Sequence, residues 1–219
     1  MEGDVRLDAL SRRLYATDAS IYEIEPVGVI LPRTTADVVH AVRVAGERGL
    51  SLLPRGGGTS LAGQAVGESL QVDFSRYMNR ILEVDAAGRW ARVEPGVVLA
   101  EFNASLAGKG LMFGPDVSTS SRANLGGMIG NNSCGAHSII HGKTIDHVLD
   151  LTVVLVDGTV TTLGPVADED DLARRCARPG IEGGAYREVQ AVVDAYGVEI
   201  DTRFPKVMRR VSGYNLDAL

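Results

Sequence analysis

The sequence is poor in cysteine, in clustered basic residues and in long apolar runs. Two cysteines, Cys134 and Cys176, cannot by themselves ligate a zinc or iron–sulfur centre, and they do not form a disulfide framework. The formal net charge is -6, and the sequence contains no cluster of lysine and arginine residues. Both facts argue against a nucleic-acid partner. No apolar run approaches membrane-spanning length, and the mixed-charge N-terminus is not a signal peptide. We therefore expect a protein with free thiols and no metal site, cytoplasmic or peripheral to the inner face of the membrane.

Glycine, in contrast, is abundant and unevenly distributed. The 219 residues suffice for one large domain or two small ones, and they include 26 glycines. These glycines gather within residues 56–67 and 108–142. This distribution predicts two loops, each with a task for its backbone.

The first glycine-rich run is Pro54-Arg55-Gly56-Gly57-Gly58-Thr59-Ser60-Leu61-Ala62-Gly63, directly after an apolar stretch that is typical of a buried strand. Consecutive glycines let a ligand approach the backbone, and successive N–H groups with nearby hydroxyls form an anion site suited to phosphate. No Lys-Ser or Lys-Thr pair follows, as a Walker loop requires, and the contiguous glycines do not match the spaced dinucleotide fingerprint. A flexible surface turn remains the alternative interpretation.

The second segment, residues 114–138, combines Gly126, Gly127 and Gly130 with many serine, threonine and asparagine side chains. Glycines allow a flat ligand to approach closely, and neutral polar side chains offer donors and acceptors without charge. A purely structural loop is the alternative. Together the two segments predict a dinucleotide lying between two subdomains.

Apolar spacing and turn residues predict an α+β fold with two sheets. Thr34 is expected to cap a helix that Gly49 ends. Ala86-Ala87-Gly88 and Asp157-Gly158 are expected to turn two hairpins. The other expected elements are helices over 6–15, 98–106, 168–171 and 186–196 and strands over 27–31, 50–54 and 70–73.

Several ordered motifs then indicate a family. They are residues 29–38, the first glycine loop, Gly114-Pro115-Asp116 and residues 125–129. With these motifs the chain resembles the FAD-linked oxidases of the vanillyl-alcohol-oxidase (PCMH) type. Residues 131–138 and 209–216 resemble more closely a branch that fuses this FAD domain to a C-terminal iron–sulfur region, the D-lactate and D-2-hydroxyglutarate dehydrogenases. The resemblance implies two α/β subdomains without a cap domain.

The resemblance also implies the division of the chain. It predicts an N-terminal helical segment over 1–25, a first FAD subdomain over 26–80, a second over 81–204 and the start of a further region over 205–219. Because residues 213–219 look like the start of another helix, we expect the chain to be part of a longer protein.

The resemblance implies roles for individual residues. Backbone N–H groups from Gly56 to Ser60 would hold the FAD pyrophosphate, and Pro32 would lie toward the adenine. Thr59 stands where relatives with covalent flavin carry histidine, so non-covalent FAD is expected. His141 and His147 depart from the family pattern, which usually has Tyr and often has Asn there. The full implied cofactor set is Pro32, Arg55, Gly56, Gly57, Gly58, Thr59, Ser60, Gly63, Gln64, Pro115, Asp116, Thr119, Gly126, Gly127, Gly130, Asn131, Asn132, Gly135 and His137.

Some side chains keep two interpretations. Asp116 is expected to hold the glycine loop through backbone N–H groups. His137 either contacts the flavin or substrate or is a loop histidine satisfied by backbone. Cys134 and Cys176 are expected to be packed residues, and Tyr214 and Asn215 are expected to approach the isoalloxazine.

The activity implied is oxidation of a D-2-hydroxy acid, such as D-lactate, glycolate or D-2-hydroxyglutarate, by hydride transfer from C2 to flavin N5. The electron acceptor and the catalytic residues remain unassigned, because the family's base and carboxylate-binding cations come from a cap domain beyond this segment. An iron–sulfur cluster is likewise expected only beyond this chain. We expect the chain alone to bind FAD weakly or not at all and not to turn over. Two alternatives remain: another flavin enzyme of this superfold, such as the UDP-N-acetylenolpyruvylglucosamine reductase kind, and a non-catalytic dinucleotide-binding module.

Overall fold

Residues 1–207 and 214–218 are described by the structure, a computed structural model, and they divide into two units. The first unit is Met1–His147 and the second is Val148–Leu219. The class is mixed α/β, as the sequence predicts. The described residues form three separate sheets, one more than expected. The subdomain boundaries predicted at residues 80 and 204 stay predictions.

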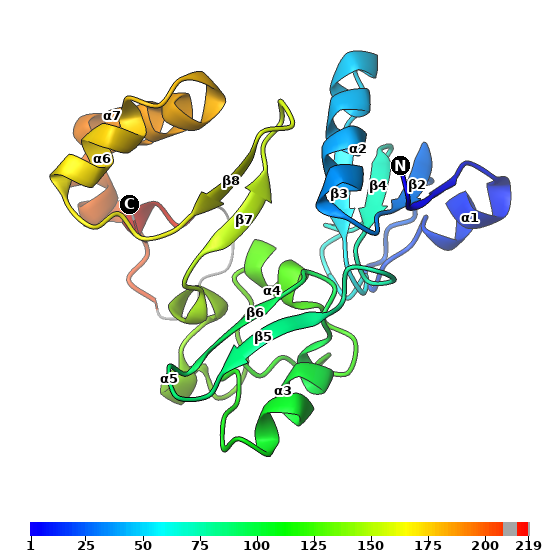
Figure 1. Ribbon diagram of the computed structural model, residues 1–219, viewed down its shortest axis with the longest axis horizontal. Coiled ribbons are helices and arrows are strands. Elements are labelled where there is room, and N and C mark those ends of the chain that lie inside the picture. The colour runs from blue at the N-terminus through cyan, green and yellow to red at the C-terminus, as the bar shows by residue number, and fades with distance from the viewer. Residues whose placement is uncertain (208–213, 219) are drawn as a thin grey trace. The chain divides into compact units, whose positions relative to one another are not determined.

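The first unit is built on a four-stranded sheet with the order β1-β2-β4-β3 (Figure 1). The strands are β1 (Asp4–Arg6), β2 (Gly28–Leu31), β3 (Leu52–Arg55) and β4 (Leu70–Asp73). β2 and β3 both run parallel to β4, so the carboxyl ends of these three strands share one edge. The first glycine loop therefore starts at that edge, directly after β3.

One face of this sheet is covered by α2 (Thr35–Arg48). Ala41 of α2 is buried against Ile30 and Leu70, with Leu52 packed beside them. Thr34 Oγ1 accepts a hydrogen bond from the Asp37 N–H at 3.2 Å, and Gly49 ends the helix at φ 62°. Both predicted helix ends are confirmed.

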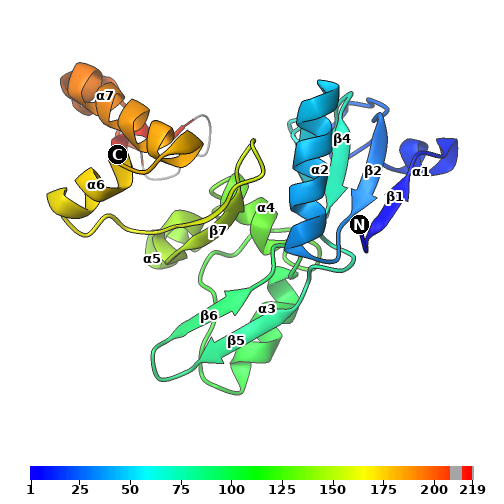
Figure 2. The same cartoon turned by 45° about the horizontal axis from the view of Figure 1, so that its top comes forward.

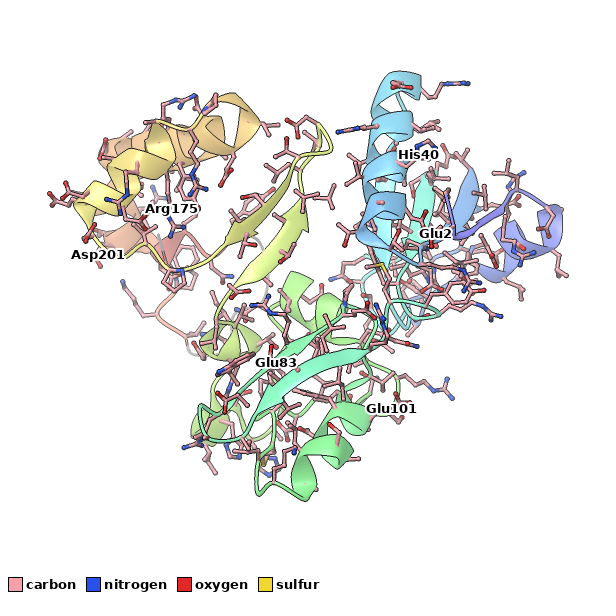
Figure 3. The ribbon with its side chains drawn as sticks, viewed as in Figure 1. Glu2, His40, Glu83, Glu101, Arg175 and Asp201 are labelled. Carbon is pink, nitrogen blue, oxygen red and sulfur yellow. The ribbon has the colours of Figure 1, made fainter. Side chains whose placement is uncertain are left out.

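The N-terminus differs from the expected helix over 6–15. Residues 4–6 form β1, antiparallel to β2, and only α1 (Ala9–Leu14) is helical, capped by Asp8. The Asp37 carboxylate fixes this arrangement, because it accepts the N–H groups of Glu2 at 2.7 Å, Gly3 at 2.9 Å and Arg33 at 3.0 Å. Figure 3 shows Glu2 beside the start of α2. Burial favours the neutral acid, but these N–H donors outweigh burial and hold the pKa of Asp37 below its usual value.

Replacing Asp37 with asparagine is expected to destabilise the protein by about 3 kcal/mol at neutral pH, because three N–H donors lose a charged acceptor. Since the folded-state pKa is lowered, this stabilisation is present above the unfolded-state pKa and is lost as the pH falls through the folded-state pKa. Urea unfolding of both proteins between neutral and acid pH measures it. A difference in unfolding free energy that is the same at every pH would contradict the role of the charge.

The rest of the first unit surrounds a second core. The hairpin strands β5 (Ile81–Asp85) and β6 (Trp90–Val93) pair antiparallel, as predicted. They pack with α3 (Leu99–Ala107) and α4 (Leu125–Gly130) around Leu99, Phe102 and Met128 (Figure 2). α5 (Ser138–His141) and the 3-10 helix η1 (Thr144–His147) complete the unit. The second glycine-rich segment thus contains a short helix, α4, that was not predicted.

The second unit contains the hairpin strands β7 (Leu151–Val154) and β8 (Val160–Leu163), the helices α6 (Glu169–Cys176) and α7 (Gly180–Arg203), and η2 (Leu216–Ala218). Arg175, labelled in Figure 3, joins α6 to α7 by donating to Asp171 at 2.9 Å and to the Tyr186 hydroxyl at 2.9 Å. α7 is longer than predicted and runs through the glycines at its start. Within the described ranges, no helix combines the length and apolarity needed to cross a bilayer. Residues 209–213 of the family motif lie outside the described residues.

Candidate functional site

The first glycine loop presents a row of free backbone donors. None of the N–H groups from Gly56 to Ser60 donates to a protein acceptor within residues 1–207 and 214–218. The backbone is left-handed at Gly58, with φ 62°, and at Gly63, with φ 78°. Gly57 has no positive φ, so a left-handed backbone is not the reason for a glycine at that residue. A run of unpaired N–H groups in such a loop is an anion-binding feature.

Gly56 and Gly57 are required for a different reason, the close approach of residues 122–124. A Cβ on Gly57 would lie 2.3 Å from the Arg122 carbonyl oxygen, and one on Gly56 would lie 2.7 Å from Asn124 Oδ1. Real Cβ atoms do not come this close to other atoms. The structure therefore brings the two glycine-rich segments of the sequence into contact.

The Arg55 side chain supports the first glycine loop through hydrogen bonds. Its Nη1 donates to the carbonyls of Tyr15 at 3.2 Å and Ala65 at 2.7 Å and to Gln71 Oε1 at 3.3 Å, and its Nη2 donates to Thr17 O at 2.7 Å. Burial lowers the pKa of this guanidinium. Because its hydrogen bonds join the N-terminal segment to both ends of the loop, the structure places Arg55 as a support for the glycines.

The glycines of the second segment divide into two kinds. A Cβ on Gly126 would lie 2.7 Å from Pro95, and one on Gly135 only 1.5 Å from the Asp116 carbonyl oxygen, so packing requires both glycines. Gly127 and Gly130 are exposed, and a Cβ on either would meet nothing within 4 Å. These two residues leave open space where the resemblance predicts a flat ring.

Asp116 and His137 form a pair inside this segment. The Asp116 carboxylate accepts the His137 backbone N–H at 3.1 Å and also hydrogen bonds to His137 Nδ1. The His137 side chain holds the pKa of Asp116 below its usual value. Asp116 was expected to hold the glycine loop through backbone N–H groups; it accepts the backbone N–H of His137 in the second segment and none of the N–H groups from Gly56 to Ser60. The imidazole of His137 remains exposed.

The other predicted site residues are placed as follows. Pro32 and Pro115 are fully buried, Thr59 and Ser60 are half-buried, and Gln64 is exposed. Thr119 turns the chain by accepting the N–H groups of Arg122 and Ala123 through its carbonyl, and Asn131 donates to Gly127 O at 3.1 Å. Asn132 is buried at φ 45°, and its Oδ1 accepts the Ile145 N–H at 3.0 Å.

Sequence reasoning missed Asn124 and Gln71. Gln71 is fully buried in β4 and donates to Tyr15 O at 3.0 Å beside Arg55, and no sequence signal indicates this position. Asn124 is 3% exposed and donates through Nδ2 to Gly96 O at 2.5 Å. Its place before the apolar Leu125 is a helix-cap signal that a sequence reading could have used.

Comparison with known proteins identifies the family. The model of the FAD binding domain family matches residues 26–164, and the chain belongs to this family. D-2-hydroxyglutarate dehydrogenase from Pantoea ananatis is 44% identical over 98% of this chain and 21% of its own length. Glycolate oxidase subunit GlcD from Bacillus subtilis is 35% identical over 83% of this chain and 40% of its own length. The chain thus spans about a fifth of the first of these relatives.

The fold has solved neighbours as well. The crystal structure of 6-hydroxy-D-nicotine oxidase from Arthrobacter nicotinovorans matches 81% of this chain and 39% of its own chain, with a TM-score of 0.67 and 25% identity. The expected resemblance to FAD-linked oxidases is confirmed.

The residues present fit FAD. The unpaired N–H groups from Gly56 to Ser60 suit a pyrophosphate, because each can donate to an anionic oxygen. The open faces of Gly127 and Gly130 leave room for a planar ring. One buried side-chain atom each of Asn124 (Oδ1) and Asn132 (Nδ2) has no hydrogen-bond partner among the described residues.

Proposed function

We propose that this chain is the FAD-binding part of a flavin-dependent dehydrogenase that oxidises a D-2-hydroxy acid. The observation that carries the proposal is the contact between the two glycine-rich segments, with a row of free N–H groups on one and open glycine faces on the other. The names of the relatives supply the reaction and the substrate class.

The chain's own contribution is to bind and position the cofactor. The N–H groups from Gly56 to Ser60 donate to the pyrophosphate oxygens, each charge-assisted bond contributing about 1.5–3 kcal/mol. Gly127 and Gly130 admit the ring, and Arg55 holds the first loop in position. Thr59 offers no nucleophilic imidazole, so binding is non-covalent. Bound FAD supplies the two-electron acceptor for the hydroxy-acid carbon.

Among D-2-hydroxy acids, D-2-hydroxyglutarate is favoured over glycolate. The Pantoea ananatis relative carries that substrate in its name and shares 44% identity over 98% of the chain, against 35% over 83% for the glycolate oxidase subunit. The same relatives favour this class over a UDP-N-acetylenolpyruvylglucosamine reductase. The general base, the carboxylate-binding cations, the electron acceptor and the iron–sulfur cluster belong to regions that this chain does not contain. A cytoplasmic location, with or without contact to the inner face of the membrane, remains part of the proposal.

Titration of the purified 219-residue chain with FAD, followed by quenching of flavin fluorescence, tests cofactor binding. The N–H groups from Gly56 to Ser60 are already free in the ligand-free chain, so of the two outcomes expected from the sequence, weak binding or none, we expect weak but saturable binding. We expect acid precipitation to release all of the flavin as free FAD. Absence of saturable binding would contradict the proposed function, and flavin retained by the precipitate would contradict the non-covalent mode. Reduction of a dye by the chain alone with D-2-hydroxyglutarate would show that turnover does not need the further regions.

A further inference from the structure

The residues that follow α1 lie against the first glycine loop, although the match to the FAD binding domain family begins only at residue 26. Residues 15–24, which we call the N-terminal strap, fold back on themselves, and the Ile24 N–H donates to Ala16 O at 2.8 Å. The cofactor set that the resemblance implies begins at Pro32 and includes no residue of the strap. The contacts between strap and loop therefore lie outside everything that the resemblance assigns.

The strap is hydrogen bonded to the first glycine loop at its centre and just beyond its end. At the centre, the Ala19 N–H donates to Gly58 O at 3.0 Å. Beyond the end, Asp18 Oδ2 accepts the Ala65 N–H at 3.2 Å. Oδ1 of the same carboxylate accepts the Ser20 N–H at 2.8 Å. Asp18 thus turns the strap at the residue that donates to Gly58.

Asp18 accepts these N–H groups as an ionised carboxylate. Burial favours the neutral acid, but the hydroxyl and N–H groups of Ser20 and the N–H of Ala65 outweigh burial and hold the pKa of Asp18 below its usual value. A charged acceptor makes stronger hydrogen bonds than a neutral one. The strap is therefore fastened to the loop by a charged group at neutral pH.

Tyr22 of the strap packs against a further glycine of the loop. A Cβ on Gly63 would lie 2.7 Å from Tyr22 Cδ2, and the backbone of Gly63 is left-handed, with φ 78°. Both facts require a glycine at this residue. The strap thus accounts for part of the composition of the loop.

The bond from Ala19 also decides the direction in which the Thr59 N–H points. In a trans peptide, the carbonyl of one residue and the N–H of the next point to opposite sides of the chain. The peptide between Gly58 and Thr59 is trans, and its carbonyl is held on the side of the strap. The Thr59 N–H therefore points away from the strap, and it donates to no acceptor among the residues that the structure describes. Because Gly58 has no Cβ to oppose a flipped peptide, the bond to Ala19 selects this orientation.

On the basis of the proposed FAD binding, we propose that the N-terminal strap is part of the cofactor site and that Asp18 is its positioning residue. Asp18 places the Ala19 N–H on Gly58 O, and this bond keeps the Thr59 N–H directed at the pyrophosphate. A carbonyl oxygen directed at the same place would repel an anion. The strap therefore presents a donor to the pyrophosphate and also keeps an acceptor away from it.

Asp18→Asn tests the proposal, because charge and position predict opposite results. If only charge mattered, removing a negative charge near an anion site would tighten the binding of an anion. An asparagine amide, however, has one acceptor oxygen and cannot accept both N–H groups as the carboxylate does. We therefore expect the Kd for FAD, measured by flavin fluorescence titration, to rise about tenfold.

Asp37→Asn is the matched control. The Asp37 carboxylate also accepts backbone N–H groups near the N-terminus, but its donors, Glu2, Gly3 and Arg33, lie outside the strap and the loop. We expect this variant to lose stability at neutral pH without a change in the Kd for FAD. A Kd that only followed the loss of stability would rise in both variants.

Ala19→Pro removes the donor itself and serves as a second test if Asp18→Asn does not fold. Proline has no N–H group to donate to Gly58 O. Ala19 is exposed and has no positive φ, so a proline ring is compatible with this residue. We again expect a rise of about tenfold in the Kd for FAD.

Unchanged or tighter FAD binding in Asp18→Asn would overturn the inference and leave the proposed function intact. An equal rise of Kd in Asp18→Asn and Asp37→Asn would overturn it as well, because the strap would then only stabilise the fold. A wild-type chain that binds no FAD would instead remove the proposed function itself, and the inference with it.

Discussion

Replacing Gly57 with valine is expected to weaken FAD binding by about a hundredfold or more. A Cβ at this residue would lie 2.3 Å from the Arg122 carbonyl oxygen, so the two glycine-rich segments must move apart. The N–H groups from Gly56 to Ser60 then lose their common direction, and losing about 3 kcal/mol of charge-assisted hydrogen bonding corresponds to roughly a hundredfold in Kd. Flavin fluorescence titration measures the affinity, and urea unfolding measures the accompanying loss of stability.

Substitutions at two other glycines distinguish the effect of packing on FAD binding from the effect of direct contact with the ligand. Gly46 lies in α2 with nothing within 4 Å of an added Cβ, so Gly46→Ala should leave FAD binding unchanged and stabilise the helix by about 0.5–1 kcal/mol. Gly127→Ala also meets no protein atom, and we expect it to fold like the wild type but to bind FAD less tightly.

The Gly57→Val prediction has its own contradicting outcome. If Gly57→Val bound FAD with wild-type affinity, the first loop would not be part of the site.

Features encoded by adjacent residues could be predicted from the sequence. The start of α2 at Thr34 and its end at Gly49 depend on local capping, and both hairpins depend on their turn residues. Residues 4–6 could not be assigned in this way. They are a strand because β2 lies beside them and because Asp37 accepts the N–H groups of Glu2 and Gly3, contacts that only the folded chain brings together.

The same distinction holds in the candidate site. Composition indicated that the glycines matter, but the reason for each one lies in a residue distant in sequence. Gly57 is required by the Arg122 carbonyl and Gly135 by that of Asp116, and neither contact leaves a pattern in the sequence. Asn124 is an ordinary helix-cap residue in the sequence, and only the structure shows that its side chain makes no cap bond and donates to Gly96 O instead.

Replacing Arg55 with leucine is expected to destabilise the protein by about 3 kcal/mol and to weaken FAD binding as a consequence. The guanidinium is the shared donor to Tyr15 O, Thr17 O, Ala65 O and Gln71 Oε1, and these acceptors would be left without it. Arg55→Lys keeps the charge, but a lysine ammonium cannot reproduce the planar fork that reaches several carbonyls at once. We therefore expect the lysine variant to recover only part of the lost stability.

The part of the protein that Arg55→Leu destabilises distinguishes this supporting role from a direct contact with the cofactor. The Ala19 N–H donates to Gly58 O at 3.0 Å, and this bond ties the N-terminal segment to the loop that Arg55 supports. Amide hydrogen exchange at Ala19 in the ligand-free protein should therefore accelerate in Arg55→Leu. Exchange in β5 and β6, which contain none of the acceptors of Arg55, should change little. If FAD affinity fell in Arg55→Leu while unfolding free energy and Ala19 exchange stayed at wild-type values, Arg55 would act on the ligand itself. Because its donors already point at four protein acceptors, we expect the loss of affinity to follow the loosening of the loop.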